Sequence, residues 1–435
     1  MGLLVGGPIG NDNRVDLEDP EILLAQLNTP AVNFMAQGIA STIPVSERTS
    51  LMETVLDSAS RNNAATTAAS ALPVLSRYPN SHEAKRALQE IEFLVANTTT
   101  AQLRDMAAAV MNAGIEHQSA PEAYAACAVV HHHAAAQEAS KNEQAAYDAY
   151  GYVMDAASRS LSQYPNAPEA YRLAGFLLDA TDYLGEKETV DSLAKAQPGT
   201  LLAWRLAELQ TGERPAFNTL QNAEAKYGLL AAWHKDVKGA TVVSEAALLR
   251  NDACALADEA LWAHPNSAVQ TRIMPLYFGL IRELPRTHAE NRVVELTRAV
   301  NEMPSSMTTW MCRAFLYREY LHTYYDQPTG ALQLLDMHDE LALGFVQSAL
   351  ENPGVAPRDK ARIEYYIGYA MFNRGWERKA IEHYERSLAY NVSDDIRDTA
   401  LYARAYTLSA IYDYQDNWEK ATEGYWEYLA EHAYG

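Results

Sequence analysis

Cysteine is scarce in this chain. Only three occur among 435 residues, and Cys127, Cys254 and Cys312 lie far apart, each inside an alanine-rich or apolar helical pattern. Thiols this few and this widely spaced exclude a disulfide-stapled secreted domain. We therefore predict three buried, reduced cysteines and a cytoplasmic protein.

Long apolar segments are absent as well. No run of about 18 consecutive apolar residues occurs, so the sequence predicts no membrane span. The first ten residues are apolar, but they lack a basic flank and are too short for a secretory signal. We interpret residues 1–20 as an extended arm, which would support a homo-oligomer if it docked on a neighbouring copy.

The third deficit is positive charge. The chain has 35 Lys and Arg residues against 56 Asp and Glu residues, which gives a formal charge of −21 at neutral pH. Such a chain repels phosphate, so nucleic acid and anionic membranes are unfavourable partners. A basic protein partner is compatible with this charge, and a solubilising acidic exterior is the simpler explanation of it.

Helix-forming residues dominate the rest of the chain. From Glu21 onward Ala, Leu, Glu, Gln, Arg and Met prevail, with apolar residues spaced at three and four. No sustained alternation of apolar and polar residues indicates a strand. The sequence predicts an all-α protein.

One short phrase recurs between these helical stretches. It reads Pro-Asn-Ser-His-Glu-Ala at 79–84, Pro-Asn-Ala-Pro-Glu-Ala at 165–170 and Pro-Asn-Ser-Ala at 265–268. Proline ends the incoming helix because it lacks an N–H and disfavours helical geometry in the preceding residue. We expect the asparagine to cap the outgoing helix, with Glu83 and Glu169 completing an arrangement that resembles a capping box.

The prolines also measure a repeat. Pro165 and Pro198 are 33 residues apart, and Pro198 and Pro265 are 67 apart, close to two such units. A period near 34 residues, built of two helices, is typical of tetratricopeptide repeats. In the stretch from Ala361, Gly368 stands at repeat position 8, Ala380 at 20 and Tyr384 at 24.

A second stretch, from Tyr402, has Ser409 at position 8, Tyr425 at 24 and Tyr428 at 27. The chain thus resembles the tetratricopeptide repeat (TPR) family, most clearly in 147–266 and 361–430. The resemblance implies an all-α, right-handed α-α superhelical solenoid of TPR-like helix pairs. It predicts an arm at 1–20, irregular helical repeats at 21–140, TPR-like repeats at 141–320, an inserted loop or helix at 321–340, and C-terminal repeats at 341–435.

The triplet His131-His132-His133 is the most conspicuous candidate for chemistry. Adjacent residues on a helix point about 100° apart, so the three rings cannot converge on one ion, and one or two of them should face solvent. The cysteines have no basic neighbours that would activate them, and the glycine-rich start lacks the Gly-Lys-Ser/Thr of a phosphate loop. We predict no catalytic residues, no metal site and no cofactor.

Aromatic residues give the strongest indication of a binding surface. The TPR family lines its concave groove with positions 2, 5, 9, 12 and 13 of the first helix in each repeat. In the C-terminal repeats the resemblance places these residues there: Arg362, Tyr365, Tyr369, Phe372, Asn373, Tyr406 and Tyr414. Tyr and Arg are favoured at interfaces because they bury a large area at a low entropic cost.

The resulting hypothesis is a non-enzymatic protein-protein interaction or assembly scaffold. It would capture a peptide or helix in the concave groove, or associate with copies of itself. Two alternatives remain open: a structural component of a virus or other large assembly, and a helical protein or enzyme that binds a glycan or another small ligand in the aromatic groove. A cluster of raised carboxylate pKa values in an enclosed pocket would favour the last of these.

Overall fold

The computed structural model describes residues 47–117, 120–239, 243–320, 340–372, 375–392 and 395–413, together with 422, 424–425 and 427–428. Over these residues the chain forms eighteen α-helices, one short 3-10 helix and no strand. The predicted all-α class of paired helices is confirmed. The arm at 1–20 and the insertion up to residue 339 lie outside the described residues. No helix within the described ranges is both long and apolar enough to cross a membrane.

The helices belong to two compact units, residues 46–280 and residues 281–392 with 396–433. We call these the N-terminal unit and the C-terminal unit. The helices that begin in the N-terminal unit are α3 (Glu47–Ser60), α4 (Ala64–Arg77), α5 (His82–Asn97), α6 (Thr100–His117), α7 (Pro121–Glu138), α8 (Glu143–Gln163), α9 (Pro168–Leu184), α10 (Lys187–Ala196), α11 (Leu201–Thr211), η1 (Phe217–Thr219), α12 (Ala223–Gly239), α13 (Val243–Ala263) and α14 (Gln270–Arg282).

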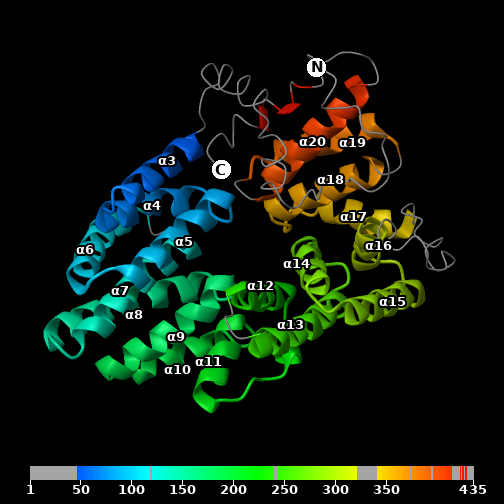
Figure 1. The fold of residues 1–435 in the computed structure, drawn as a ribbon. Coiled ribbons are helices and arrows are strands. Elements are labelled where there is room, and N and C mark those ends of the chain that lie inside the picture. Colours follow the sequence, from blue (N-terminus) through cyan, green and yellow to red (C-terminus); the bar gives the residue numbers. More distant parts are fainter. Residues whose placement is uncertain are drawn as a thin grey trace. The chain divides into compact units, whose positions relative to one another are not determined.

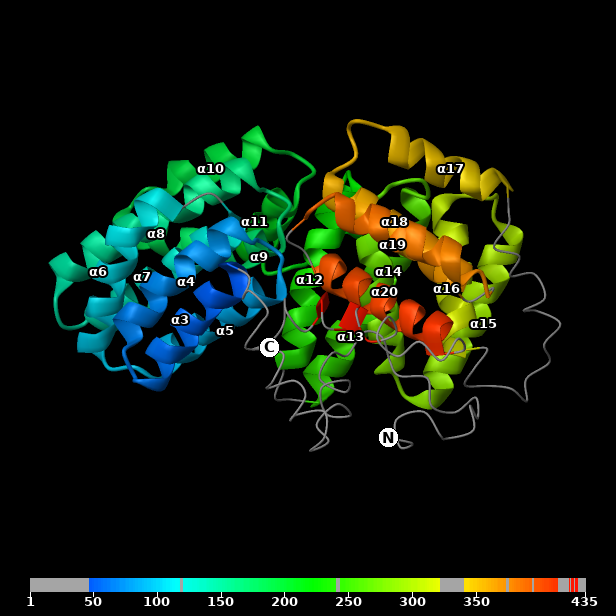
Figure 2. The ribbon, with the colours of Figure 1, turned by 90° about the horizontal axis from the view of Figure 1, so that it is seen from above.

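Two layers run through the N-terminal unit (Figure 1). In the inner layer α3 packs on α5, α5 on α7, α7 on α9 and α9 on α12. The other helices of the early pairs lie behind them, with α4 against α6 and α8 against α10. Figure 2 shows the same succession of paired helices from a second direction.

Small side chains allow these helices to approach closely. Alanines fill much of the interior, and Cys127 on α7 and Cys254 on α13 are buried among them. Cys312 is buried on a helix of the C-terminal unit. The prediction that all three cysteines are buried and form no disulfide is confirmed.

The C-terminal unit contains α15 (Arg286–Glu302), α16 (Met307–Tyr320), α17 (Glu340–Glu351), α18 (Pro357–Phe372), α19 (Glu377–Ala389) and α20 (Asp395–Asp413). Its α18–α19 pair packs through the residues that carry the repeat resemblance. A Cβ added at Gly368 would lie 2.7 Å from the Tyr384 ring and 3.0 Å from the Ala380 carbonyl oxygen. The Ser387 hydroxyl donates to the Ala361 carbonyl at 2.8 Å, which joins the end of the repeat to its beginning.

The next predicted copy packs in a similar way. The rings of Tyr425 and Tyr428 lie 6.2 and 5.6 Å from that of Tyr402, centroid to centroid. Burial raises the pKa of Tyr425 to about 12, against the opposing effect of a hydrogen bond with Ser409. Repeat positions 8 and 24 therefore meet here as well.

The role predicted for asparagine in the recurring phrase is wrong. Ser81 caps α5, with its hydroxyl accepting from the Ala84 N–H at 3.1 Å, while Asn80 adopts a left-handed conformation with φ of 65°. Helix α9 begins after Ala167, with a proline in its first turn and no side-chain cap. The capping boxes are absent too, since Glu83 instead pairs with Arg48 at 3.1 Å.

The phrase connects each repeat to the next. The Asn80 N–H donates to Glu122 Oε1 at 2.9 Å, at the start of α7. In the second copy Asn166 Oδ1 accepts from the Leu201 N–H at 3.0 Å. The Pro165 carbonyl also accepts from the Leu202 N–H at 3.0 Å. These turns supply backbone and side-chain groups that the following helices need at their ends.

Helix α12 comes still closer to the second turn. A Cβ added at Gly228 would lie only 2.1 Å from the Asn166 carbonyl oxygen. No side chain fits that space, so the backbone of α12 packs directly against the turn between α8 and α9.

We expect Gly228→Ala to destabilise the protein by about 1–3 kcal/mol, because the added methyl group overpacks a backbone contact. Gly175→Ala is the matched control, since Gly175 also lies inside a helix but a Cβ there meets nothing within 4 Å. This control should gain up to about 1 kcal/mol from helix propensity. Thermal unfolding followed by circular dichroism measures both, and equal stability of the two variants would contradict the packing argument.

Candidate partner-binding surfaces

Those predicted groove residues of the C-terminal repeats that the structure describes lie on α18 and α20. Arg362, Tyr365 and Tyr369 are buried, with 8%, 2% and 7% of their surface exposed. The Tyr365 ring centroid lies 5.0 Å from that of Tyr366 and 5.8 Å from that of Tyr384. In this structure these tyrosines pack the two helices together.

Two other predicted residues are more accessible. Phe372 and Tyr406 are half-buried, and their ring centroids are 5.6 Å apart. Asn373 and Tyr414 lie outside the described residues. A binding role for the seven residues stays a prediction, and among the described ones a partner would reach Phe372 and Tyr406 most directly.

Equivalent groove positions exist in the N-terminal unit. In the repeat that begins at Pro168, positions 5, 9 and 12 are Arg172, Phe176 and Asp179, all on α9. We call these three residues the α9 stripe. Their spacing of four and three places them on one helix face. Arg172 and Asp179 are exposed and Phe176 is half-buried.

The stripe is held in place by a histidine of the neighbouring helix α7. The His132 ring stacks on Phe176 with centroids 4.3 Å apart, and its Nε2 lies 3.0 Å from Asp179 Oδ2. The Arg172 guanidinium also lies over the Phe176 ring, 5.2 Å from the ring centroid. Burial lowers the pKa of His132, and the contact with Asp179 only partly opposes that shift.

The other two histidines of the triplet point elsewhere. His131 stacks on Tyr152 of α8 at 5.0 Å, and His133 Nδ1 lies 3.0 Å from the Val129 carbonyl of its own helix. The rings diverge, as expected for adjacent helical residues. His131 is buried, whereas His132 and His133 are partly exposed, in agreement with the expectation that one or two of the three face solvent. The described part of the chain holds no cluster of three or more metal-binding side chains.

Glu92 of helix α5 forms ion pairs with residues of two other helices, α9 and α12. Glu92 accepts from Arg172 Nη1 at 2.7 Å and from Lys235 Nζ, on α12, at 2.9 Å. All three side chains are partly exposed, so these pairs order the side chains more than they stabilise the fold. The next residue, Phe93, has 63% of its surface exposed.

The twelfth residues of three successive inner helices therefore follow one another along this face. They are Phe93 on α5, His132 on α7 and Asp179 on α9, counted from the helix starts at His82, Pro121 and Pro168. We call the face formed by Glu92, Phe93, His132 and the α9 stripe the inner face. It combines an exposed aromatic ring with paired charges of both signs.

Two carboxyl groups of the inner layer have raised pKa values. Burial raises the pKa of Glu169, with the neighbouring Glu122 carboxylate as a second cause. Burial also raises the pKa of Asp236 on α12. Neither lines the two recesses, of about 460 and 680 Å³, that lie along residues 214–218 and 375–379. Neither recess therefore contains either of these carboxyl groups with a raised pKa, which was the combination expected of a ligand-binding or enzymatic protein.

A long connection between α11 and α12 forms a second surface. Helix α11 ends at Thr211 and α12 begins at Ala223, so eleven residues lie between them, against two to six between the other helices of this unit. The connection is anchored at several points. The Trp204 Nε1–H donates to the Pro215 carbonyl at 3.1 Å, the Gln221 N–H donates to the Gly199 carbonyl at 3.0 Å, and Leu220 is buried.

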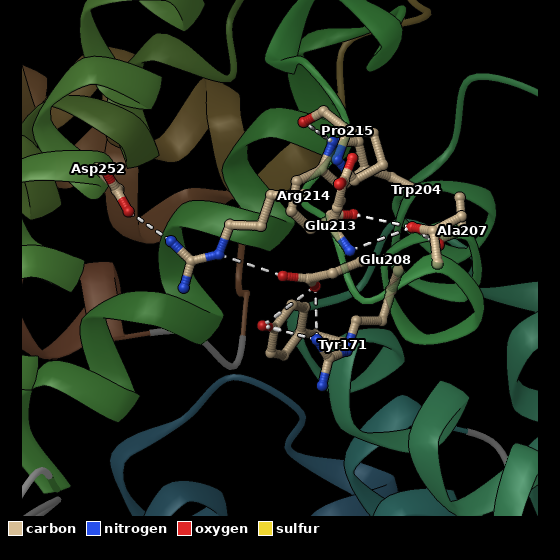
Figure 3. A network of polar contacts seen from close by, with 10 residues as sticks. Tyr171, Trp204, Ala207, Glu208, Glu213, Arg214, Pro215 and Asp252 are labelled. Carbon is tan, nitrogen blue, oxygen red and sulfur yellow. Dashed lines mark hydrogen bonds and ion pairs between the residues drawn. The ribbon is translucent and has the colours of Figure 1, made fainter.

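Arg214 joins this connection to the surrounding helices (Figure 3). Its Nε donates to Glu208 Oε1 at 3.2 Å, and its Nη1 pairs with Asp252 on α13. Its guanidinium also lies 4.9 Å from the Trp233 ring centroid. Glu208 in turn pairs with Arg205, so the network continues to α11 and, through Tyr171, to α9 (Figure 3). The recess of about 460 Å³ lies beside it, lined by residues 214–218, Asp252 and Glu259.

Sequence reasoning missed both surfaces of the N-terminal unit. The repeat register from Pro168 would have found the α9 stripe if the groove positions had been applied there. The long connection was hidden because the 67-residue spacing from Pro198 to Pro265 matches two repeats. In the structure α10 and α11 have only 10 and 11 residues, and the connection fills the difference. Its turn-forming residues Gly212, Pro215, Asn218 and Asn222 were the available signal.

Comparisons with known proteins give no basis for assigning a function. No protein-family model matches the chain, and no curated protein matches it. Among solved structures, a human IFIT1 dimer with m7Gppp-AAAA shares 14% identity over 95% of this chain and 84% of that chain, with a TM-score of 0.26. A human IFIT1 dimer with PPP-AAAA shares 16% identity over 89% of this chain and 95% of that chain, also with a TM-score of 0.26. Similarity at this level supports no conclusion about function.

The buried His131 makes a testable contribution to pH dependence. Burial lowers its pKa from 6.5 to about 4. Since the folded pKa lies below the unfolded one, its contribution to stability is complete above pH 6.5 and is lost as the pH falls toward 4. We expect a loss of about 2 kcal/mol between pH 7.5 and pH 5.

Replacing His131 by Phe should remove this contribution while keeping a ring against Tyr152. The measurement is the free energy of unfolding by urea at several pH values, compared with the wild type and with His133→Phe on the same helix. An unchanged pH slope in His131→Phe, or an equal change in both variants, would contradict the assignment.

Proposed function

We propose that this chain is a non-enzymatic interaction scaffold of TPR-like helix pairs, which binds a segment of a protein partner on the inner face. The observation that carries the proposal is the alignment of Phe93, His132 and Asp179 at equivalent positions of three successive helices. In repeat proteins, residues at equivalent positions of stacked units form a continuous binding surface.

The chemistry of the inner face supports a protein ligand. Its exposed aromatic ring, that of Phe93, belongs to a residue type that is enriched at protein interfaces. Stacking and ion pairing hold Arg172, Phe176 and Asp179 in place, so little conformational entropy remains to be lost on binding. The mixed charges suit a peptide with polar and apolar side chains.

Charge favours a protein over a nucleic acid. The IFIT1 structures described above contain RNA, but a formal charge of −21 opposes contact with phosphate in this chain. The Arg172 and Lys235 cations are also already paired with Glu92. We propose a cytoplasmic scaffold, and self-association through residues 1–20 stays a prediction.

A ligand-binding or enzymatic function is the second candidate. The raised pKa of Glu169 favours it, because carboxyl groups that stay protonated near neutral pH are common in active sites. Glu122 beside it already accepts the Asn80 N–H, which is a structural role. We therefore rank this candidate below the scaffold.

Affinity capture from the native host, with quantitative mass spectrometry, tests the scaffold. We expect Phe93→Ser to weaken recovery of specific partners about tenfold, the effect of losing an interface anchor worth about 1–2 kcal/mol. Leu248→Ser is the matched control, since Leu248 is 68% exposed on α13, away from the inner face.

A third variant, Tyr406→Ala, tests the groove predicted for the C-terminal repeats. Partners lost with Tyr406→Ala but kept with Phe93→Ser would move the site to that groove. Equal recovery with all three variants would contradict both sites.

A further inference from the structure

We propose that the recess beside the α11–α12 connection is a second interaction site, which binds a basic, extended segment of a protein partner. This site is separate from the inner face and goes beyond the function proposed above. Its walls are residues 214–218 on one side and Asp252 and Glu259 of α13 on the other.

The recess is preformed. Arg214 and Pro215 anchor the first end of the connection, through Glu208, Asp252 and Trp204, and Leu220 and Gln221 anchor its second end. Phe217 packs edge-on against the buried Trp233, with ring centroids 5.7 Å apart, and remains half-buried. A partner therefore meets a fixed shape with part of an aromatic ring in its wall.

The two carboxylates retain acceptor capacity. Asp252 Oδ2 pairs with Arg214, and Glu259 Oε1 accepts from Lys226 at 2.6 Å. Within the described part of the chain, Asp252 Oδ1 and Glu259 Oε2 have no hydrogen-bond donor, and the two side chains are 46% and 35% exposed. An ionised carboxylate accepts through both oxygens, so each can take a further N–H donor from outside.

The available acceptors select an occupant that carries N–H donors. Two carboxylates and one guanidinium line the recess, and Lys226 pairs with Glu259, so the local charges nearly balance while one oxygen of each carboxylate still lacks a donor among the described residues. An anion would face both carboxylates. A compact apolar ligand would find charged walls in place of the enclosed, mostly apolar cavity that such ligands prefer. A lysine or arginine can lay its aliphatic stem on Phe217 and keep its charged head at a carboxylate.

Spacing specifies the segment further. Asp252 and Glu259 are seven residues apart on one face of α13, which corresponds to about 10 Å along the helix. An extended chain in the polyproline II conformation rises about 3.1 Å per residue and has three residues per turn, so side chains three positions apart share one face and lie about 9 Å apart. The occupant is therefore an extended segment with two basic residues three positions apart, one for each carboxylate.

Fluorescence anisotropy with labelled twelve-residue peptides tests this site on the full-length protein. The probe carries two arginines three residues apart in a Gly-Ser background. Comparison peptides carry adjacent arginines, or glutamates in place of the arginines. We expect the probe to bind, the adjacent-arginine peptide to bind more weakly, and the glutamate peptide not to bind. Binding should weaken as salt rises.

Variants then locate the site. Asp252→Asn with Glu259→Gln should weaken probe binding at least tenfold, and Phe217→Ala should weaken it about threefold. The matched control is Glu188→Gln with Asp191→Asn, which removes two exposed carboxylates from α10 and gives the same change in net charge. The control should bind within twofold of the wild type.

Three outcomes would overturn the proposal: no probe binding by the wild type, equal binding of the arginine and glutamate peptides, or an equal loss in the site and control variants. Circular dichroism confirms that each variant is folded. Phe93→Ser should bind the probe normally, so failure of the inner face and failure of the recess give different results.

Discussion

The contact between the Asn166 carbonyl and the Gly228 backbone positions both surfaces of the N-terminal unit. It sets α12 directly on the turn between α8 and α9, at a distance that no side chain at position 228 allows. Two turns further along α12, Lys235 reaches Glu92, and between them Trp233 lies beneath Arg214. Helix α12 thus supports both the inner face, through Lys235, and the recess, through Trp233. Displacement of α12 would disturb the two together.

Internal pairing decides what these surfaces offer a partner. Glu92 is matched by two cations, Arg214 by two carboxylates, and the buried Lys226 by Glu259. A partner that competed for these pairs would gain little, because each new ion pair would replace an existing one. Recognition then depends on groups that remain available: the exposed Phe93 ring, the half-buried Phe217 ring and the outward oxygens of Asp252 and Glu259. Such a surface gains specificity from fixed positions more than from net charge.

The sequence predicted the features that depend on short-range pattern. Periodicity gave the helices, and the repeat register assigned Gly368 and Tyr384 to positions 8 and 24, which the structure brings into contact. The cap assigned to Asn80 was wrong because Ser81, one residue later, is also a good N-cap and takes that role. Asn80 instead adopts a left-handed turn conformation, which asparagine also favours, and the residue pattern does not decide between the two roles. The Glu92–Lys235 pair joins residues 143 positions apart. It depends on how the helix layers curve, which no local pattern contains.

Two ionisable groups, the buried His131 and the half-buried Glu169, oppose each other in their effect on stability. His131 has a lowered pKa, so its contribution is lost as the pH falls. Glu169 has a raised pKa, so its contribution is complete at low pH and is lost as the pH rises toward its folded pKa. Both groups favour their neutral form near neutral pH, which spares the inner layer the cost of burying a charge. The pH slopes that the two groups contribute to stability have opposite signs and partly cancel. A weak pH dependence of the free energy of unfolding of the wild type would therefore conceal two opposite contributions. Each contribution becomes measurable when the other side chain is replaced.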